Sequence, residues 1–296
     1  ANNTSPTIGT TAFAIDPGVD IVGAGGRIVQ SSLEGIRASD TGSVFIRGVD
    51  FVQNGIANSR DAIFASSTTG QADFLSVRSS NFTQSGLSGI HTTSVPNVSI
   101  VNAQFLQNGR SAVVPQILLE AGLIPLDGPD ADLLVDPYIF FIDTIRLTEN
   151  QTNGIEVTSL AGGAGSILNF TMQNSNLTLN AGAGPQSALN VNWTGPMGLL
   201  IDTNQIAFLG SGNGGIDITS GSTTDAAGIT VTNNTFTGPS FNNTGLLITA
   251  QNPTTIAVNN NTFNQGGIFD TATFFTLGAN ADVTMNTNTV TSAGDQ

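Results

Sequence analysis

The chain has 296 residues, of which only 9% are charged, and it contains neither cysteine nor lysine. Seven arginines against 21 acidic residues give a net charge of −14, so the surface would repel nucleic acid, and disulfide and thiolate chemistry are excluded. No apolar run approaches the roughly 18 residues that a membrane-spanning helix requires.

The first 25 residues are polar with two short apolar segments. Residues 1–6 lack an initiating methionine and a signal peptide, which fits a processed mature chain or an excised fragment. Apolar residues then alternate at 13–15 and 19–22, so residues 1–25 are expected to form a first coil or an N-terminal cap. The abundance of Asn, Thr, Ser and Gly with few charges is typical of an extracellular protein, and we expect this location.

From residue 44 to residue 290 one eight-residue pattern recurs nine times, and Ile229–Phe236 is its clearest copy. Its first, third and eighth positions are apolar in every copy. The eighth positions, called anchors here, are Phe51, Phe82, Phe105, Leu147, Leu177, Ile206, Phe236, Phe263 and Val290. The third positions are Ile46, Val77, Ile100, Ile142, Met172, Ile201, Val231, Val258 and Met285, and the first are Val44, Leu75, Val98, Phe140, Phe170, Leu199, Ile229, Ile256 and Val283.

The spacing within the pattern predicts two strands joined by a turn. Apolar residues two apart lie on one face of a strand. The gap before the anchor then holds turn-forming residues such as Asn233-Asn234 and Asn260-Asn261, after which a second strand begins. Successive anchors are 23 to 42 residues apart, and no helical periodicity lies between them. This period predicts a solenoid of parallel strands, with one coil for each copy.

A short glycine-isoleucine step follows many of the anchors. It occurs as Gly35-Ile36, Ala62-Ile63, Gly89-Ile90, Gly154-Ile155, Gly215-Ile216, Gly245-Leu246 and Gly267-Ile268. Together with the Asn-Asn-x-Phe turn, this pattern resembles the pectate-lyase-like family of right-handed parallel β-helices over residues 26 to 290. The resemblance implies a single all-β domain of about ten coils, and at about 4.8 Å per coil the rod would be roughly 50 Å long. It does not imply one function, because the family includes lyases, glycosidases, adhesins and structural stalks.

One coil carries an insertion at residues 115–137. Pro115 is suited to a first helical position and Gly122 to a helix end, so Ile117, Leu118 and Ala121 are expected on one side of a short helix. The remaining residues would form a loop. Because this insertion is apolar as well as long, we expect it to cover a lateral face or to contact a neighbouring molecule.

Candidate catalytic residues are few. Polysaccharide lyases of the resembling family use an Arg or Lys base beside acids that hold calcium, and the nearest equivalents here are Arg47 and Arg78 with Asp50 and Asp73. A simpler interpretation is an outward arginine ladder paired to acids on neighbouring coils. Related polygalacturonases carry Asp-Asp and Gly-His-Gly signatures, but this chain has no Asp-Asp pair and His91 lacks the following glycine. We assign no catalytic residue and interpret His91 as an exposed strand residue.

The insertion also contains a candidate metal site. Asp127, Asp130, Asp132 and Asp136 supply hard oxygen ligands within ten residues, so calcium is the metal that they would hold. Their spacing matches no EF-hand loop, and a solvated acidic loop is the alternative. Trp193 and Tyr138 are the two obvious candidates for stacking against a sugar ring, but two isolated aromatics do not form a glycan-binding strip. No other cofactor is expected.

The expected function is therefore a structural or adhesive extracellular module. We expect copies to associate end to end or through the insertion 115–137, with a glycan as a further candidate ligand. No amphipathic capping helix follows Val290, so the last coil should expose unpaired strand edges. The alternative is a carbohydrate-active enzyme, either a lyase or a glycoside hydrolase with two carboxylates on adjacent coils.

Overall fold

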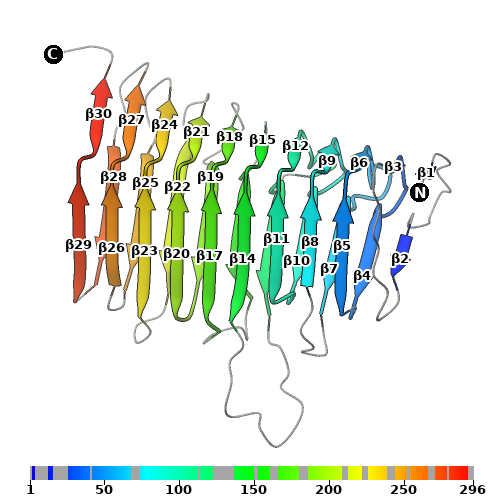
Figure 1. Cartoon of the computed structure of the whole chain (residues 1–296), viewed down its shortest axis with the longest axis horizontal. Coiled ribbons are helices and arrows are strands. Elements are labelled where there is room, and N and C mark those ends of the chain that lie inside the picture. The colour runs from blue at the N-terminus through cyan, green and yellow to red at the C-terminus, as the bar shows by residue number, and fades with distance from the viewer. Residues whose placement is uncertain are drawn as a thin grey trace, which may run out of the picture.

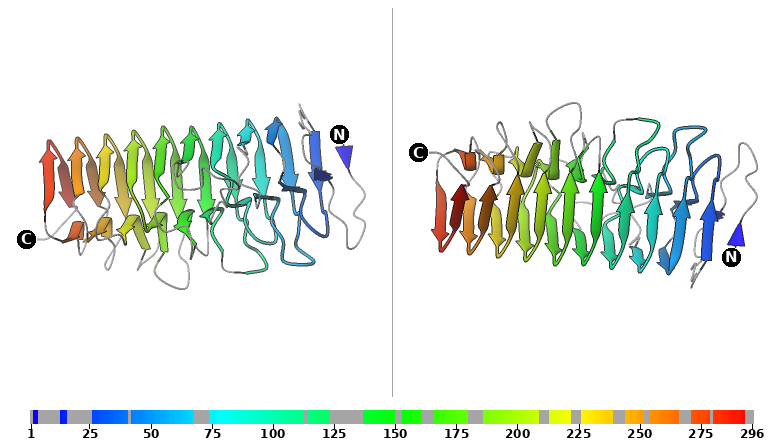
Figure 2. Two further views of the ribbon diagram at one scale, coloured as in Figure 1. Left: turned by 90° about the horizontal axis from the view of Figure 1, so that it is seen from below. Right: turned by 90° about the horizontal axis from the view of Figure 1, so that it is seen from above.

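The computed structural model forms one elongated right-handed parallel β-helix, with the two chain termini at opposite ends (Figures 1 and 2). It describes residues 2–3, 13–15, 26–40, 42–67, 74–112, 114–122, 137–149, 153–160, 166–179, 186–208, 213–221, 226–238, 244–251, 254–265, 271–278 and 280–292. The described residues form thirty strands and no helix. Every strand pair is parallel, which confirms the predicted fold class.

The strands belong to three sheets, named A, B and C here. Sheet A contains β1 Asn2–Asn3, β3 Gly26–Val29, β6 Val49–Val52, β9 Asn81–Thr83, β12 Gln104–Leu106, β15 Arg146–Glu149, β18 Asn176–Leu179, β21 Gln205–Phe208, β24 Thr235–Gly238, β27 Thr262–Gln265 and β30 Thr289–Ser292. Sheet B contains β2 Phe13–Ile15, β4 Ile36–Ser39, β7 Ile63–Ser66, β10 Ile90–Thr93, β13 Ile117–Ala121, β16 Ile155–Ser159, β19 Gln186–Trp193, β22 Asn213–Ser220, β25 Thr244–Ala250 and β28 Thr271–Leu277. Sheet C contains β5 Ser43–Arg47, β8 Phe74–Arg78, β11 Asn97–Val101, β14 Tyr138–Asp143, β17 Leu168–Gln173, β20 Met197–Asp202, β23 Ala227–Thr232, β26 Thr254–Asn259 and β29 Ala281–Asn286.

The chain visits the sheets in the order B, C, A and then starts the next coil. For example, β4, β5 and β6 make one coil, and β7, β8 and β9 make the next. From β3 to β27 each strand therefore pairs with the strand three places later in the chain, as Figure 1 shows for the row from β5 to β29. The first two strands, β1 and β2, pair with β3 and β4. Side chains alternate between the interior and the solvent along each strand, so the same sequence position projects on the same face in every coil.

The interior contains the apolar positions that the repeat predicts. Eight of the nine residues in each of the three predicted columns are buried. Anchor rings of neighbouring coils stack, with centroids 4.8 Å apart for Phe51 and Phe82 and 4.7 Å apart for Phe236 and Phe263. The glycine of the Gly-Ile step lies against this stack, because a Cβ atom on Gly89 would come within 2.8 Å of the Phe105 ring.

The turn from sheet C to sheet A has the same backbone conformation in every coil. Its first residue has a positive φ throughout: Gly48, Ser79, Asn102, Thr144, Asn174, Thr203, Asn233, Asn260 and Thr287, with φ between 49° and 65°. Asparagine tolerates this left-handed conformation better than most residues, which explains its frequency at this position. The following residue points inward, and from Asn204 onward it is asparagine in each coil.

One expectation for an individual segment is wrong. Residues 117–121 form strand β13 and not a helix, and this strand pairs with β10 and β16. Ile117, Leu119 and Ala121 are buried, because pairing with two neighbouring strands decides the structure over local preference. The last coil has the exposed apolar residues expected of an uncovered end, since Val283, Met285 and Val290 occupy core columns but are exposed.

Candidate functional site

Three surfaces of the rod could carry a function: a charged cluster on sheet B, a groove on sheet C and the open coil at the C-terminal end. The charged cluster centres on His91 of β10. Its Nδ1 atom lies 3.1 Å from Oδ2 of Asp61, and its Nε2 atom lies 2.9 Å from Oε2 of Glu120. Asp61 is itself held in place, because its Oδ1 atom accepts a hydrogen bond from the backbone N–H of Ser88 at 2.8 Å.

The two carboxylates keep the imidazole protonated. Burial by itself would lower the pKa of His91, but the hydrogen bonds and negative charges of Asp61 and Glu120 outweigh it and raise this pKa to about 9. The hydrogen bond from His91 in turn lowers the pKa of Glu120, despite the opposing effect of burial. At neutral pH the ring is therefore an imidazolium ion with both N–H groups engaged, so neither nitrogen is available as a general base.

Further contacts extend this cluster towards the N-terminal end of sheet B. The Phe64 ring meets the His91 ring edge to face, with centroids 5.1 Å apart, and the Arg37 guanidinium lies 5.2 Å from the centroid of Phe64. Arg37 and Arg60 both pair with the buried Glu34, at 3.5 Å and 3.9 Å. These contacts connect four successive coils, so the cluster stabilises the stacking of the coils.

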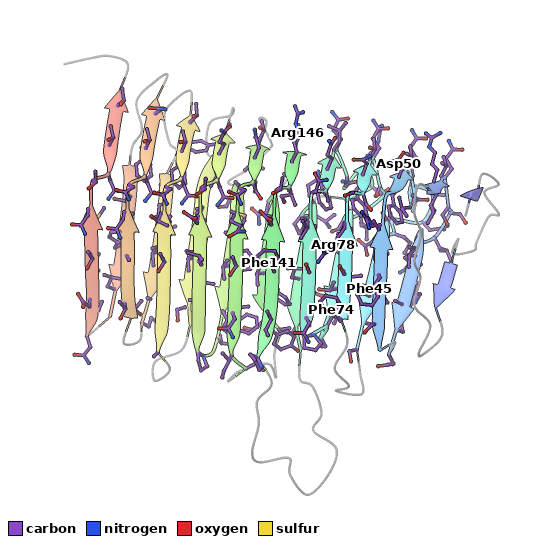
Figure 3. All side chains as sticks on the ribbon, in the orientation of Figure 1. Phe45, Asp50, Phe74, Arg78, Phe141 and Arg146 are labelled. Carbon is purple, nitrogen blue, oxygen red and sulfur yellow. The ribbon has the colours of Figure 1, made fainter. Side chains whose placement is uncertain are left out.

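The groove lies on the outer face of β5 and β8. Arg47 and Arg78 are direct neighbours in the register of these strands, and both are exposed. Beside them the Phe45 and Phe74 rings approach to 5.5 Å between centroids at an interplanar angle of 57°. Figure 3 shows Phe45, Phe74 and Arg78 close together on this face. The cavity has a volume of about 330 Å³ and is lined by Phe45, Ile46, Arg47, Phe74, Ser76 and Arg78.

The arginine ladder is present on this face, but the described residues place no acid in an ion pair with it. Within the described residues neither Arg47 nor Arg78 forms an ion pair. Asp50 lies on sheet A and accepts a hydrogen bond from Asn81 at 2.6 Å, and Figure 3 shows it away from Arg78. Asp73 lies outside the described residues.

The calcium prediction rests on residues that the structure does not describe, because Asp127, Asp130, Asp132 and Asp136 all fall within 123–136. Among the described residues, no group of three or more His, Cys, Asp or Glu side chains is arranged to hold a metal ion. The described residues also contain no helix that is long and apolar enough to cross a membrane.

The two candidate sugar-stacking aromatics are buried, so neither can stack against a sugar ring. Trp193 and Tyr138 occupy inward positions of β19 and β14. The Trp193 Nε1–H donates a hydrogen bond to the backbone oxygen of Ser166 at 2.9 Å. The Tyr138 hydroxyl donates one to the backbone oxygen of Gly122, also at 2.9 Å. Both rings fill the core and have no face available to a ligand.

The open coil is formed by β28, β29 and β30, which are the last strands of their sheets among the described residues. Val283, Met285 and Val290 are 36%, 45% and 60% exposed, whereas the equivalent residues one coil earlier, Ile256, Val258 and Phe263, are buried. This end therefore presents apolar side chains together with the outer edges of three parallel strands.

No family model, no curated protein and no solved structure matches this chain.

Proposed function

We propose that this chain is a structural and adhesive rod of an extracellular assembly, and that copies associate end to end through the open coil. The observation that supports this proposal is the exposure of Val283, Met285 and Val290 in columns that are otherwise buried. Covering them removes apolar surface from water, which is favourable at about 25 cal/mol per Å². Exposed strand edges also template the addition of further strands.

A second copy of the chain is the partner with the matching cross-section. Its N-terminal coil begins with β1 and β2, which already pair in parallel with β3 and β4. Contact between a C-terminal coil and the N-terminal coil of the next copy is heterologous, so repeated contacts produce a filament unless the rotation closes a ring. The described part of the insertion does not add a contact, because Ile117, Leu119 and Ala121 are buried in the rod.

The composition supports an extracellular location. The chain is rich in Asn, Thr, Ser and Gly, and only 9% of its residues are charged. Its solvent-facing columns are rich in Thr, Asn and Ser, for example Thr158, Asn192, Thr219 and Thr249 along sheet B. Such a surface remains hydrated with few charges and suits a stalk exposed to the medium.

The test is the oligomeric state of the whole chain over a range of concentrations, measured by light scattering after gel filtration and by electron microscopy. We expect the mass to rise with concentration and linear particles to appear. The double variant Met285→Glu and Val290→Glu should remain monomeric, because association would bury its charged side chains at the contact.

A matched control places the same charges on the side of the rod. Ile139 and Leu200 on sheet C are 46% and 38% exposed, so Ile139→Glu with Leu200→Glu changes the net charge equally without touching the end. This variant should associate as the wild type does. A wild-type protein that stays monomeric at every concentration, or an end variant that still associates, would contradict the proposal.

A further inference from the structure

The groove on the outer face of β5 and β8 has two distinct halves. One half is cationic, because Arg47 and Arg78 are aligned on adjacent strands, which lie about 4.8 Å apart in a parallel sheet. The other half is apolar, because the Phe45 and Phe74 rings meet at 5.5 Å. Ser76 lies directly opposite Phe45 in the register and adds a hydroxyl to the lining.

The two arginines lie directly opposite each other in the register of β5 and β8. Arg37 and Arg60 share the carboxylate of Glu34, whereas Arg47 and Arg78 have no ion pair within the described residues. Two like charges on neighbouring strands repel each other, and directly opposed like charges destabilise a sheet. An anion bound between them would relieve this repulsion. In a protein of net charge −14, these side chains also form a local cationic site for such an anion.

Geometry restricts the chemical form of this anion. Guanidinium groups bind carboxylates through pairs of parallel N–H···O hydrogen bonds, so two aligned arginines can hold both oxygens of one carboxylate. The adjoining phenylalanine rings favour a flat apolar body, because aromatic rings stack in tilted or offset arrangements. Phe45 is 38% exposed, so a ligand would remove apolar surface from water on binding.

We propose that this groove is a binding site for an aromatic carboxylate, with the carboxylate between Arg47 and Arg78 and the ring against Phe45 and Phe74. The cavity of about 330 Å³ lies at the lower end of the range for small-molecule sites. It therefore suits a ligand with one or two fused rings. This site is on the side of the rod and is independent of the association proposed for the open coil.

The experiment compares two probes of the same shape. Binding of 2-naphthoate and of the neutral 2-naphthamide to the full chain is measured by isothermal titration calorimetry and probe fluorescence. Because a hydrogen bond to a charged group contributes more than about 1.4 kcal/mol, we expect 2-naphthoate to bind at least about tenfold more tightly than 2-naphthamide. Raising the salt concentration should weaken the binding of the anion and leave that of the amide nearly unchanged.

Variants locate the binding site. Arg47→Gln and Arg78→Gln should each weaken 2-naphthoate binding about tenfold and leave 2-naphthamide binding nearly unchanged. Phe45→Ser should weaken the binding of both probes. Arg146→Gln is the matched control, because Arg146 is an exposed arginine on sheet A at a distance from the groove in Figure 3. It should bind both probes as the wild type does.

Three results would overturn the proposal. They are the absence of saturable 2-naphthoate binding, equal affinity of the wild type for the two probes, and unchanged 2-naphthoate binding in both arginine variants. All four substituted residues are partly or fully exposed, so the circular dichroism spectrum and the thermal midpoint should match those of the wild type. A loss of binding in the arginine variants with an unchanged midpoint then reports the site and not the fold.

Discussion

Asn234 donates two hydrogen bonds to the side-chain oxygen of Asn261 on the next coil, from its backbone N–H at 2.9 Å and from its Nδ2 at 3.1 Å. The same arrangement links Asn204 to Asn234 and Asn261 to Asn288. The amide groups also donate back to the preceding coils, as Asn234 does to the carbonyl oxygen of Ile201 at 2.9 Å. At this turn the backbone is not paired within a sheet. The asparagine ladder supplies hydrogen-bond partners to the buried polar groups there.

Removing one member of this ladder should be costly. In Asn234→Ala the backbone N–H and the Nδ2 of Asn204 lose their acceptor, and the carbonyl of Ile201 loses a donor. Because each buried polar group left without a partner costs about 1–3 kcal/mol, we expect a loss of about 3 kcal/mol or more in the free energy of unfolding. Urea denaturation followed by circular dichroism measures it.

The control for this substitution is Asn176→Ala, which removes the same amide from an exposed position of β18. It should change the stability by less than about 0.5 kcal/mol. Equal losses of unfolding free energy in the two variants would show that the hydrogen bonds of the ladder do not stabilise the protein.

The charged cluster predicts a dependence of stability on pH. The pKa of His91 is raised from 6.5 to about 9, so between these values the folded state holds a proton that the unfolded state releases. Stability from this residue is complete below pH 6.5 and decreases as the pH rises towards 9, by about 3 kcal/mol in total. Denaturation at several pH values between 6 and 9.5 would follow this decrease.

The substitution His91→Gln separates this effect from other titrations. Glutamine can still donate a hydrogen bond but carries no titrating proton, so the stability of this variant should be nearly flat between pH 6.5 and 9. The pKa of the buried Tyr138 is raised to about 12, which places its titration outside this window. Wild type and variant with the same slope would exclude His91 as the group responsible.

A charge placed in a core column should unfold the rod. Val231 is buried at an inward position of β23, and Val231→Asp would bury an unpaired carboxylate at a cost of several kcal/mol. Thr230 precedes it on the same strand and points outward, so Thr230→Asp is the control and should melt close to the wild type. Thermal unfolding of the two variants compares them directly. A Val231→Asp protein that melts like its parent would disprove the assignment of inward and outward positions.

The core columns were predictable because every coil repeats one inside-outside alternation. Val283, Met285 and Val290 follow the same alternation, and their exposure arises only because no further coil covers them among the described residues. The helix predicted at 115–122 failed for another reason. Ile117, Leu119 and Ala121 alternate as a strand does, but Leu118 between them is also apolar and hides the alternation.

The sites were harder to predict because they depend on which residues become neighbours across coils. Asp61, His91 and Glu120 are about thirty residues apart, and Glu120 reaches His91 only because β13 pairs with β10 in the register that aligns Ile117 with Ile90. Phe74 was missed because it precedes the apolar pattern of β8. Its proximity to Phe45 depends on the alignment of β5 with β8, which loop lengths determine.

The final prediction concerns salt, which should affect the two proposed interactions in opposite directions. Each rod carries a net charge of −14, so end-to-end association brings together like-charged molecules through an apolar contact. Raising the ionic strength from about 0.01 M to about 0.1 M shortens the Debye length from about 30 Å to about 10 Å and screens this repulsion. Association measured by light scattering should therefore strengthen with salt, while 2-naphthoate binding at Arg47 and Arg78 weakens. The Met285→Glu and Val290→Glu double variant, which should remain monomeric, gives the baseline at each ionic strength. Association that weakens with salt would instead indicate that opposite charges hold the copies together, and the open coil would then not be the contact.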